Sequence, residues 1–213
     1  MQIRFATGVL VLFFVSSAEA KDVKICGQER DSKTAMISCP SLRGDADFDG
    51  LEHFTNLKII DLNRPRAKAN LSDSTLKKIA SYEHLKDTMQ ELRLAGKKPT
   101  GAGWKAFFAS FPELTKVSAI RSSVDDTALE GLAQAKKLEE LSVRESAATC
   151  SGLRHLVDLP KLKLIDVSKL DCSDKDVEVL LKLKGLEILR ARGTDFSNAA
   201  HEKLTAAGIK VID

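Results

Sequence analysis

One apolar pattern recurs along this sequence at a nearly fixed interval. The pattern is L-x-x-L-x-L, with other apolar residues allowed at each L. Its copies have the middle residues Ile60, Leu92, Val117, Leu141, Ile165 and Leu189. From Val117 onward, consecutive middle residues are 24 positions apart. A fixed period of this size predicts a repeat protein, in which a unit buries its apolar side only by stacking on its neighbours.

The second half of each unit repeats as well. Eight positions after the middle residue stand Thr100, Asp125, Thr149, Ser173 and Ser197. These residue types begin helices because their side-chain oxygen accepts from a free backbone N–H. Apolar residues follow at helical spacing, and Ser72 begins the helix of the first full unit. Each unit is therefore predicted to be a short strand followed by a capped helix, and strands that recur in this way must run parallel.

The pattern resembles the leucine-rich repeat family, in its helix-containing, ribonuclease-inhibitor-like or bacterial secreted type. The resemblance covers residues 44–213 and is strongest over 186–197. It implies an α/β fold, a right-handed solenoid of about six to seven repeats with parallel strands on its concave face. The family's usual Asn, five residues after the middle Leu, is absent. Hydroxyls of Ser122, Ser146 and Thr194 can replace it, whereas Pro65, Lys97 and Leu170 predict a less regular turn.

The first twenty residues predict a secretory signal peptide rather than part of the fold. A basic start is followed by an apolar run over 5–15 and by small residues that end at Ala20. The apolar run is shorter than the roughly 20 residues that span a bilayer, and no later segment approaches that length. We therefore expect residues 1–20 to be cleaved and the mature protein to be periplasmic or extracellular, without a membrane span.

Residues 21–43 do not fit the repeat, and two apolar stretches, 23–26 and 34–39, predict a β-hairpin that caps the solenoid. Cys26 and Cys39 lie on opposite arms of that hairpin, so an exported protein is expected to join them, with two buried thiols as the alternative. Cys150 and Cys172 lie in adjacent repeats. Whether they form a disulfide or two buried thiols depends on whether their Cα atoms lie within about 7 Å.

Composition and motifs argue against several functions. The net charge is only +3, and most aromatic residues of the repeats fall in core positions, which disfavours nucleic acid. The four histidines and four cysteines have no metal-binding spacing, and no residue set predicts a nucleophile with its base. We therefore expect neither catalysis, nor a cofactor, nor a metal.

The residues beside the inward-facing leucines should project from the strands, about 4.8 Å apart from repeat to repeat. The candidate partner-binding residues are Arg64, Arg93, Arg121, Ser142, Arg144, Asp166, Arg190 and Arg192. Arginine suits carboxylate and phosphate partners because it donates two parallel hydrogen bonds. The leading hypothesis is a secreted or periplasmic module that binds another protein through its concave face. The alternatives are recognition of an anionic glycan or lipid head group, and a solvated face without a ligand. The basic insertion at 64–71 is either a binding loop or an idle one.

Overall fold

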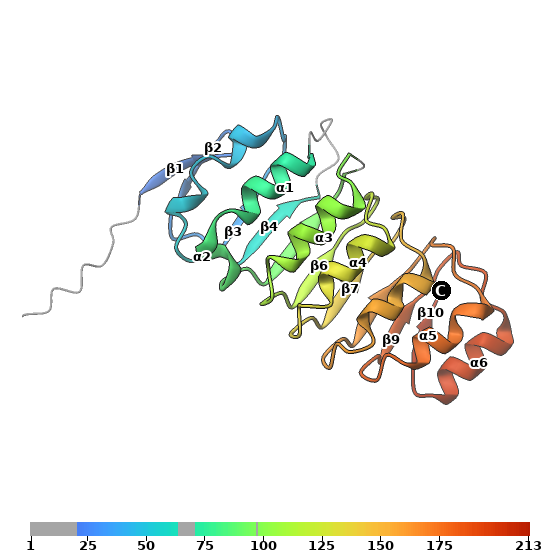
Figure 1. Ribbon diagram of the computed structural model, residues 1–213. Coiled ribbons are helices and arrows are strands. Elements are labelled where there is room, and N and C mark those ends of the chain that lie inside the picture. The colour runs from blue at the N-terminus through green and yellow to red at the C-terminus, as the bar shows by residue number, and fades with distance from the viewer. Residues whose placement is uncertain (1–20, 64–70, 97) are drawn as a thin grey trace, which may run out of the picture.

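The computed structural model describes residues 21–63, 71–96 and 98–213, and Figure 1 shows the elements. The strands are β1 (Asp22–Ile25), β2 (Gln28–Asp31), β3 (Met36–Ser38), β4 (Ile59–Leu62), β5 (Glu91–Leu94), β6 (Lys116–Ser118), β7 (Glu140–Ser142), β8 (Leu164–Asp166), β9 (Ile188–Arg190) and β10 (Lys210–Ile212). The α-helices are α1 (Asp73–Ala80), α2 (Glu83–Lys86), α3 (Gly101–Ala109), α4 (Asp126–Leu132), α5 (Val177–Leu181) and α6 (Asn198–Ala206). The 3₁₀ helices are η1 (Asp45–Phe48), η2 (Leu51–His53), η3 (Cys150–Leu156) and η4 (Asp174–Asp176).

The fold is α/β, with one parallel sheet covered by helices on one face (Figure 1). Eight strands lie side by side in the order β10-β9-β8-β7-β6-β5-β4-β3. The middle residues of the repeat are paired with one another, as Val117 with Leu141 and Leu141 with Ile165. The 24-residue period therefore corresponds to one step across the sheet, and the architecture fits a solenoid of the leucine-rich repeat kind.

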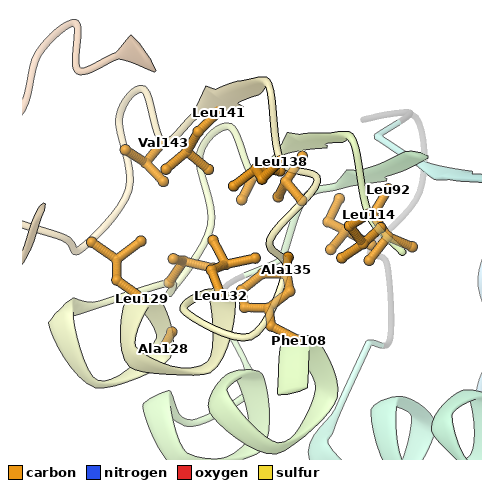
Figure 2. Close-up of a cluster of buried hydrophobic side chains, with 14 of the residues drawn as sticks. Leu92, Phe108, Leu114, Ala128, Leu129, Leu132, Ala135, Leu138, Leu141 and Val143 are labelled. Atoms are coloured by element: carbon orange, nitrogen blue, oxygen red, sulfur yellow. The ribbon is translucent and has the colours of Figure 1, made fainter. Parts of the chain in front are cut away.

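The hydrophobic core lies between the sheet and the helices. Figure 2 shows Leu141 and Val143 of one strand segment directed toward Leu129 and Leu132 of α4, and all four side chains are fully buried. The aromatic residues expected in the core are there as well, since Trp104 and Phe107 of α3 are buried. At about 25 cal/mol per Å² of apolar surface removed from water, this continuous core is the main source of stability.

The residues predicted to begin helices do so. Ser72, Thr100, Asp125, Thr149 and Ser197 each accept a hydrogen bond through the side chain from the backbone N–H three residues later. Ser173 begins η4, and there Asp176 Oδ2 accepts from the Ser173 backbone N–H at 3.0 Å. The helix type differs from the expectation in two repeats, where η3 and η4 are 3₁₀ helices.

Neighbouring helices are joined by a carboxylate that occupies the first helical position. Asp73 accepts from the backbone N–H and the hydroxyl of Thr100, at 2.8 and 2.7 Å. Asp126 does the same for Thr149, at 2.8 and 2.8 Å, and Asp174 for Ser197, at 2.8 and 2.6 Å. The Ser197 donors hold the pKa of the Asp174 carboxyl below its ordinary value. These bonds fix the beginning of one helix to the beginning of the next.

In the repeat of η3, a disulfide occupies the position that an aspartate has in α1, α4 and η4. Cys150 begins η3 and is bonded to Cys172, which directly precedes the next cap, Ser173. Their Cα atoms are 5.1 Å apart, within the range that a disulfide can close. Cys26 and Cys39 are bonded too, with Cα atoms 5.2 Å apart. Both disulfides considered from the sequence are thus present in the structure.

The turns after β6, β7, β8 and β9 each use a left-handed residue. Arg121, Glu145 and Lys169 have φ of 54°, 54° and 60°, and Gly193 has φ of 71°. The hydroxyls that replace the missing Asn follow directly. The Ser122 and Thr194 hydroxyls donate to the carbonyls of the third residue before them, both at 2.7 Å. Pro65 and Lys97 lie outside the described residues.

The N-terminal hairpin is formed by different residues from those expected. β1 pairs in antiparallel fashion with β2 around Cys26 and Gly27, whereas residues 36–38 form β3 of the main sheet. Ile37 pairs with Ile60, 23 residues later, which places it in the middle-residue row of the repeat. The prediction of 34–39 as a hairpin arm was therefore wrong, because this segment already belongs to the repeat pattern. Val23 and Ile25 of β1 are buried.

The predicted signal peptide, residues 1–20, lies outside the described part of the chain. Among the residues that the structure does describe, no helix combines the length and the apolar character needed to cross a bilayer.

Candidate functional site on the open face of the sheet

We call the side of the parallel sheet opposite the helices the open face. Two rows of side chains from the strands project there. The first row precedes the buried middle residues and consists of Met36, Ile59, Glu91, Lys116, Glu140, Leu164, Ile188 and Lys210. The second row follows them and consists of Ser38, Asp61, Arg93, Ser118, Ser142, Asp166, Arg190 and Ile212. Register thus confirms that the projecting residues form ladders.

Charges in the N-terminal half of the open face are paired with one another. Arg93 Nε donates to Glu91 Oε1 at 2.7 Å, and its Nη1 lies 3.6 Å from Asp61 Oδ2. The hydrogen bond to Glu91 raises the pKa of Arg93. Lys116 Nζ and Glu140 Oε2 are 2.7 Å apart. These pairs leave this half of the face with little uncompensated charge for a partner.

Glu145 is the centre of a second cluster, at the edge of the open face where the left-handed turns are stacked. It accepts from Arg121 Nε at 2.9 Å and from Lys169 Nζ at 3.2 Å, and Arg144 Nε lies 3.4 Å away. The hydrogen bonds from Arg121 and Lys169 lower the pKa of Glu145 to about 2. Arg121 therefore holds Glu145 within the chain and does not present a free guanidinium to a partner.

The C-terminal half of the open face carries cations without partners. Within the described ranges, the side chains of Arg190 and Arg192 form no hydrogen bond or ion pair, and both residues are exposed. The buried Nε of Arg144 also has no hydrogen-bond acceptor there. A groove of about 290 Å³ extends from β6 to β9, and its lining includes Arg144, Asp166 and Arg190. Leu164 lines the same groove and, like Ile188 beside it in the first row, is half-buried.

The structure divides the predicted site residues into separate groups. Ser142, Arg144, Asp166 and Arg190 line one groove, as expected for a common surface. Asp166 is buried and internally engaged, since its Oδ1 accepts from the Ser168 N–H at 3.0 Å and its Oδ2 from the Ser142 hydroxyl at 3.3 Å. Ser142 and Asp166 therefore shape the groove floor, and their side chains are not free to bind a partner. The predicted residue Arg64 lies outside the described residues.

Sequence reasoning missed Leu164, Ile188 and Ser168 as site residues. The signal for the first two was available, since they stand one position before the middle residues Ile165 and Leu189 and alternate with them on the strand. Ser168 could not be selected in this way, because its importance depends on which neighbouring cations are already paired.

Other parts of the described chain offer less chemistry. The residues described contain no group of three or more His, Cys, Asp or Glu side chains that could hold a metal ion. A groove of about 450 Å³ on the helical side lies between α1 and α3 and is lined mainly by apolar groups, including Leu76, Ala80 and Phe107.

Comparisons with known proteins bear on the fold alone. No family model and no curated protein matches the chain. Among solved structures, the chain is similar to an internalin from Listeria monocytogenes, a leucine-rich repeat protein, with a TM-score of 0.50 and 16% sequence identity. The similarity covers 81% of this chain and 56% of that chain, so this protein spans little more than half of the internalin's length. The fold is of the leucine-rich repeat kind. The comparison supports the sequence resemblance to that family at the level of the fold, and it does not show which type of leucine-rich repeat is present.

Proposed function

We propose that the protein is an exported, non-catalytic module that binds another protein through the C-terminal half of the open face. The observation that carries this proposal is the combination of two half-buried aliphatic side chains, Leu164 and Ile188, with the unpaired Arg190 and Arg192. The buried centres of protein interfaces are more apolar than the rest of the surface, and arginine is enriched there. Solenoid repeats offer such a surface in extended, concave form.

Export is proposed on independent grounds. Two disulfides in a chain of this size are typical of proteins that fold in an oxidising compartment. The N-terminal twenty residues have the order of a signal peptide. In the same proposal, the β1–β2 hairpin caps the first repeat through the buried Val23 and Ile25.

The alternative is a polymer with negative charge along its whole length, such as an acidic glycan, or a lipid head group. The unpaired arginines favour it. The carboxylates of Glu91, Glu140 and Asp166 on the same face oppose it, because a uniformly charged chain laid along the rows would meet them. A protein partner, in contrast, can place its negative charges beside the unpaired arginines and away from these carboxylates.

Site-specific photo-crosslinking in the native host tests the proposal. A photoreactive residue replaces Ser118, which lines the groove, and a control replaces the exposed Thr127 on α4. We expect one discrete protein adduct from position 118, none from position 127, and loss of the adduct when Arg190 and Arg192 are both changed to Glu. Equal adducts from both positions, or adducts only with glycan or lipid, would contradict a protein-binding open face.

A further inference from the structure

A small pocket adjoins the groove at the edge of the open face. Its volume is about 180 Å³, and its lining residues are Arg144, Ser168, Lys169 and Arg192. Arg144 also lines the larger groove, so the two hollows lie on either side of the same residue. The pocket thus lies beside the surface that we propose to bind a protein, and it is built almost entirely from cationic side chains.

The repeat explains why a hollow forms at this place. The backbone ladder continues beyond the strands, since Glu145 N donates to the Ser168 carbonyl at 3.1 Å and Lys169 N to the Arg192 carbonyl at 2.9 Å. Arg144, Ser168 and Arg192 therefore occupy the same position in three consecutive repeats, 24 residues apart. The short serine side chain between two arginines, with strands about 4.8 Å apart, leaves room that a longer residue would fill.

The charges around the pocket do not balance. Arg121, Arg144 and Lys169 share one carboxylate, that of Glu145, and Arg192 lines the pocket beside Arg144 and Lys169. Arg121 and Lys169 donate to both oxygens of that carboxylate. Arg192 has no acceptor among the described residues, and the buried Nε of Arg144 forms no hydrogen bond there, although Glu145 Oε1 lies 3.4 Å from it as an ion-pair partner. A buried donor without an acceptor costs about 1–3 kcal/mol, so an incoming anion is favoured here.

We propose that Arg144, Lys169 and Arg192, together with the Ser168 hydroxyl, form a subsite for one carboxylate group of the partner protein, carried by an aspartate or glutamate side chain. This inference rests on the proposed function. A localised carboxylate matches planar guanidinium donors. An extended polyanion does not, because it would continue into the groove, whose lining includes the carboxylates of Asp166 and Glu140.

The inference can be tested without the partner. Acetate stands in for the carboxylate, and the side-chain Nε–Hε NMR signals of arginine are followed while acetate replaces chloride at constant ionic strength. We expect saturable shifts of the Arg144 and Arg192 signals. Arg192→Gln should weaken acetate binding about three- to fivefold, as expected for loss of one partly exposed ion pair. Arg154→Gln, the same change at an exposed arginine of η3, should leave the binding unchanged.

A second variant should change the acetate affinity in the opposite direction. Glu145→Gln removes the carboxylate that competes for Arg121, Arg144 and Lys169, so acetate should bind more tightly than to the wild type. Linear shifts of equal size at Arg154 would overturn the subsite. If sulfate but not acetate caused saturable shifts of the arginine signals, the assignment of the subsite to a carboxylate would be overturned. Because acetate binding and partner crosslinking are separate measurements, failure of the carboxylate subsite can be distinguished from failure of the proposed function.

Discussion

At the residue scale, Glu145 shows how one side chain can organise three repeats. It occupies a left-handed backbone position, with φ of 54°, which costs a non-glycine residue about 1–2 kcal/mol. Its carboxylate lies between Arg121 of the preceding repeat and Lys169 of the following one. The backbone strain is thus accompanied by contacts that a glycine at this position could not make.

The lowered pKa of Glu145 leads to a prediction about pH. Because its pKa in the folded protein is about 2, below the ordinary value of 4.5, the folded state favours the ionised form. The resulting stabilisation is complete above pH 4.5 and is lost as the pH falls toward 2. We therefore expect the urea midpoint of the wild type to fall more steeply between pH 5 and pH 2 than that of Glu145→Gln. Glu202→Gln, at an exposed residue of α6, is the control and should follow the wild type. Parallel profiles of the wild type and Glu145→Gln would contradict the prediction.

Gly103 gives a second prediction at this scale. It occupies the third position of α3, where alanine would normally stabilise a helix by about 1 kcal/mol relative to glycine. A Cβ there would lie 2.2 Å from Oδ1 of Asp73, whose carboxylate is held by two hydrogen bonds from Thr100, one to each oxygen. Gly103→Ala should therefore lower the free energy of unfolding by about 1–3 kcal/mol in the wild type.

In an Asp73→Ala background, the same Gly103→Ala change should instead be neutral or stabilising, because the obstructing carboxylate is gone. Urea denaturation of the four proteins in this double-mutant cycle measures the interaction directly. If Gly103→Ala destabilises both backgrounds equally, the contact with Asp73 is not the reason for the glycine.

At the element scale, the period of the sequence predicted the strands and the beginnings of the helices, because both depend on local patterns. The register between neighbouring strands followed from the 24-residue interval without any knowledge of distant contacts. The hairpin was assigned to the wrong residues because Met36–Ser38 is a short strand whose apolar signal rests on Ile37. The spacing from Ile37 to Ile60 would have placed it in the sheet.

What the sequence could not predict is the division of the arginines into paired and unpaired groups. Arg93 and Arg190 stand at equivalent positions of the repeat. Arg93 has Glu91 on its own strand and Asp61 on the neighbouring one, whereas Arg190 has Ile188 and Asp166 in those places. Asp166 is occupied by Ser142 and the Ser168 backbone, so Arg190 stays unpaired. Such outcomes depend on competition between side chains rather than on spacing.

The disulfide between Cys150 and Cys172 supports a prediction for the repeats that contain η3 and η4. It closes a loop of 22 residues, for which the loss of unfolded-state entropy is worth about 2–4 kcal/mol. The double variant Cys150→Ala, Cys172→Ala should lose about that amount in free energy of unfolding, measured by urea denaturation under oxidising conditions. Adding a reductant should narrow the difference from the wild type. An unchanged midpoint would show that the inter-repeat contacts around Ser173 suffice without the covalent bond.

At the scale of the whole molecule, the open face has two unlike halves. Its N-terminal half neutralises its own charges through Arg93, Lys116 and their carboxylates. Its C-terminal half combines Leu164 and Ile188 with unpaired arginines. The overall net charge of +3 gives no indication of this asymmetry. A partner that uses both apolar contact and a localised negative charge is therefore directed to one end of the sheet.

The linear arrangement of repeats also implies that stability varies along the molecule, because each strand is supported only by its immediate neighbours. β7 and β8 are paired on both sides, and the Cys150–Cys172 disulfide joins the segments that follow them. β10 pairs only with β9 within the described chain, and its Ile212 is 36% exposed. Hydrogen exchange followed by mass spectrometry should therefore find the amides of β10 and α6 exchanging faster than those of β7 and β8. In the double cysteine variant, protection should fall around β7 and β8 and stay unchanged around β4 and β5, which lie several repeats away. Uniform loss of protection along the chain would instead mean that the solenoid opens as a single cooperative unit, with the disulfide acting on all repeats at once.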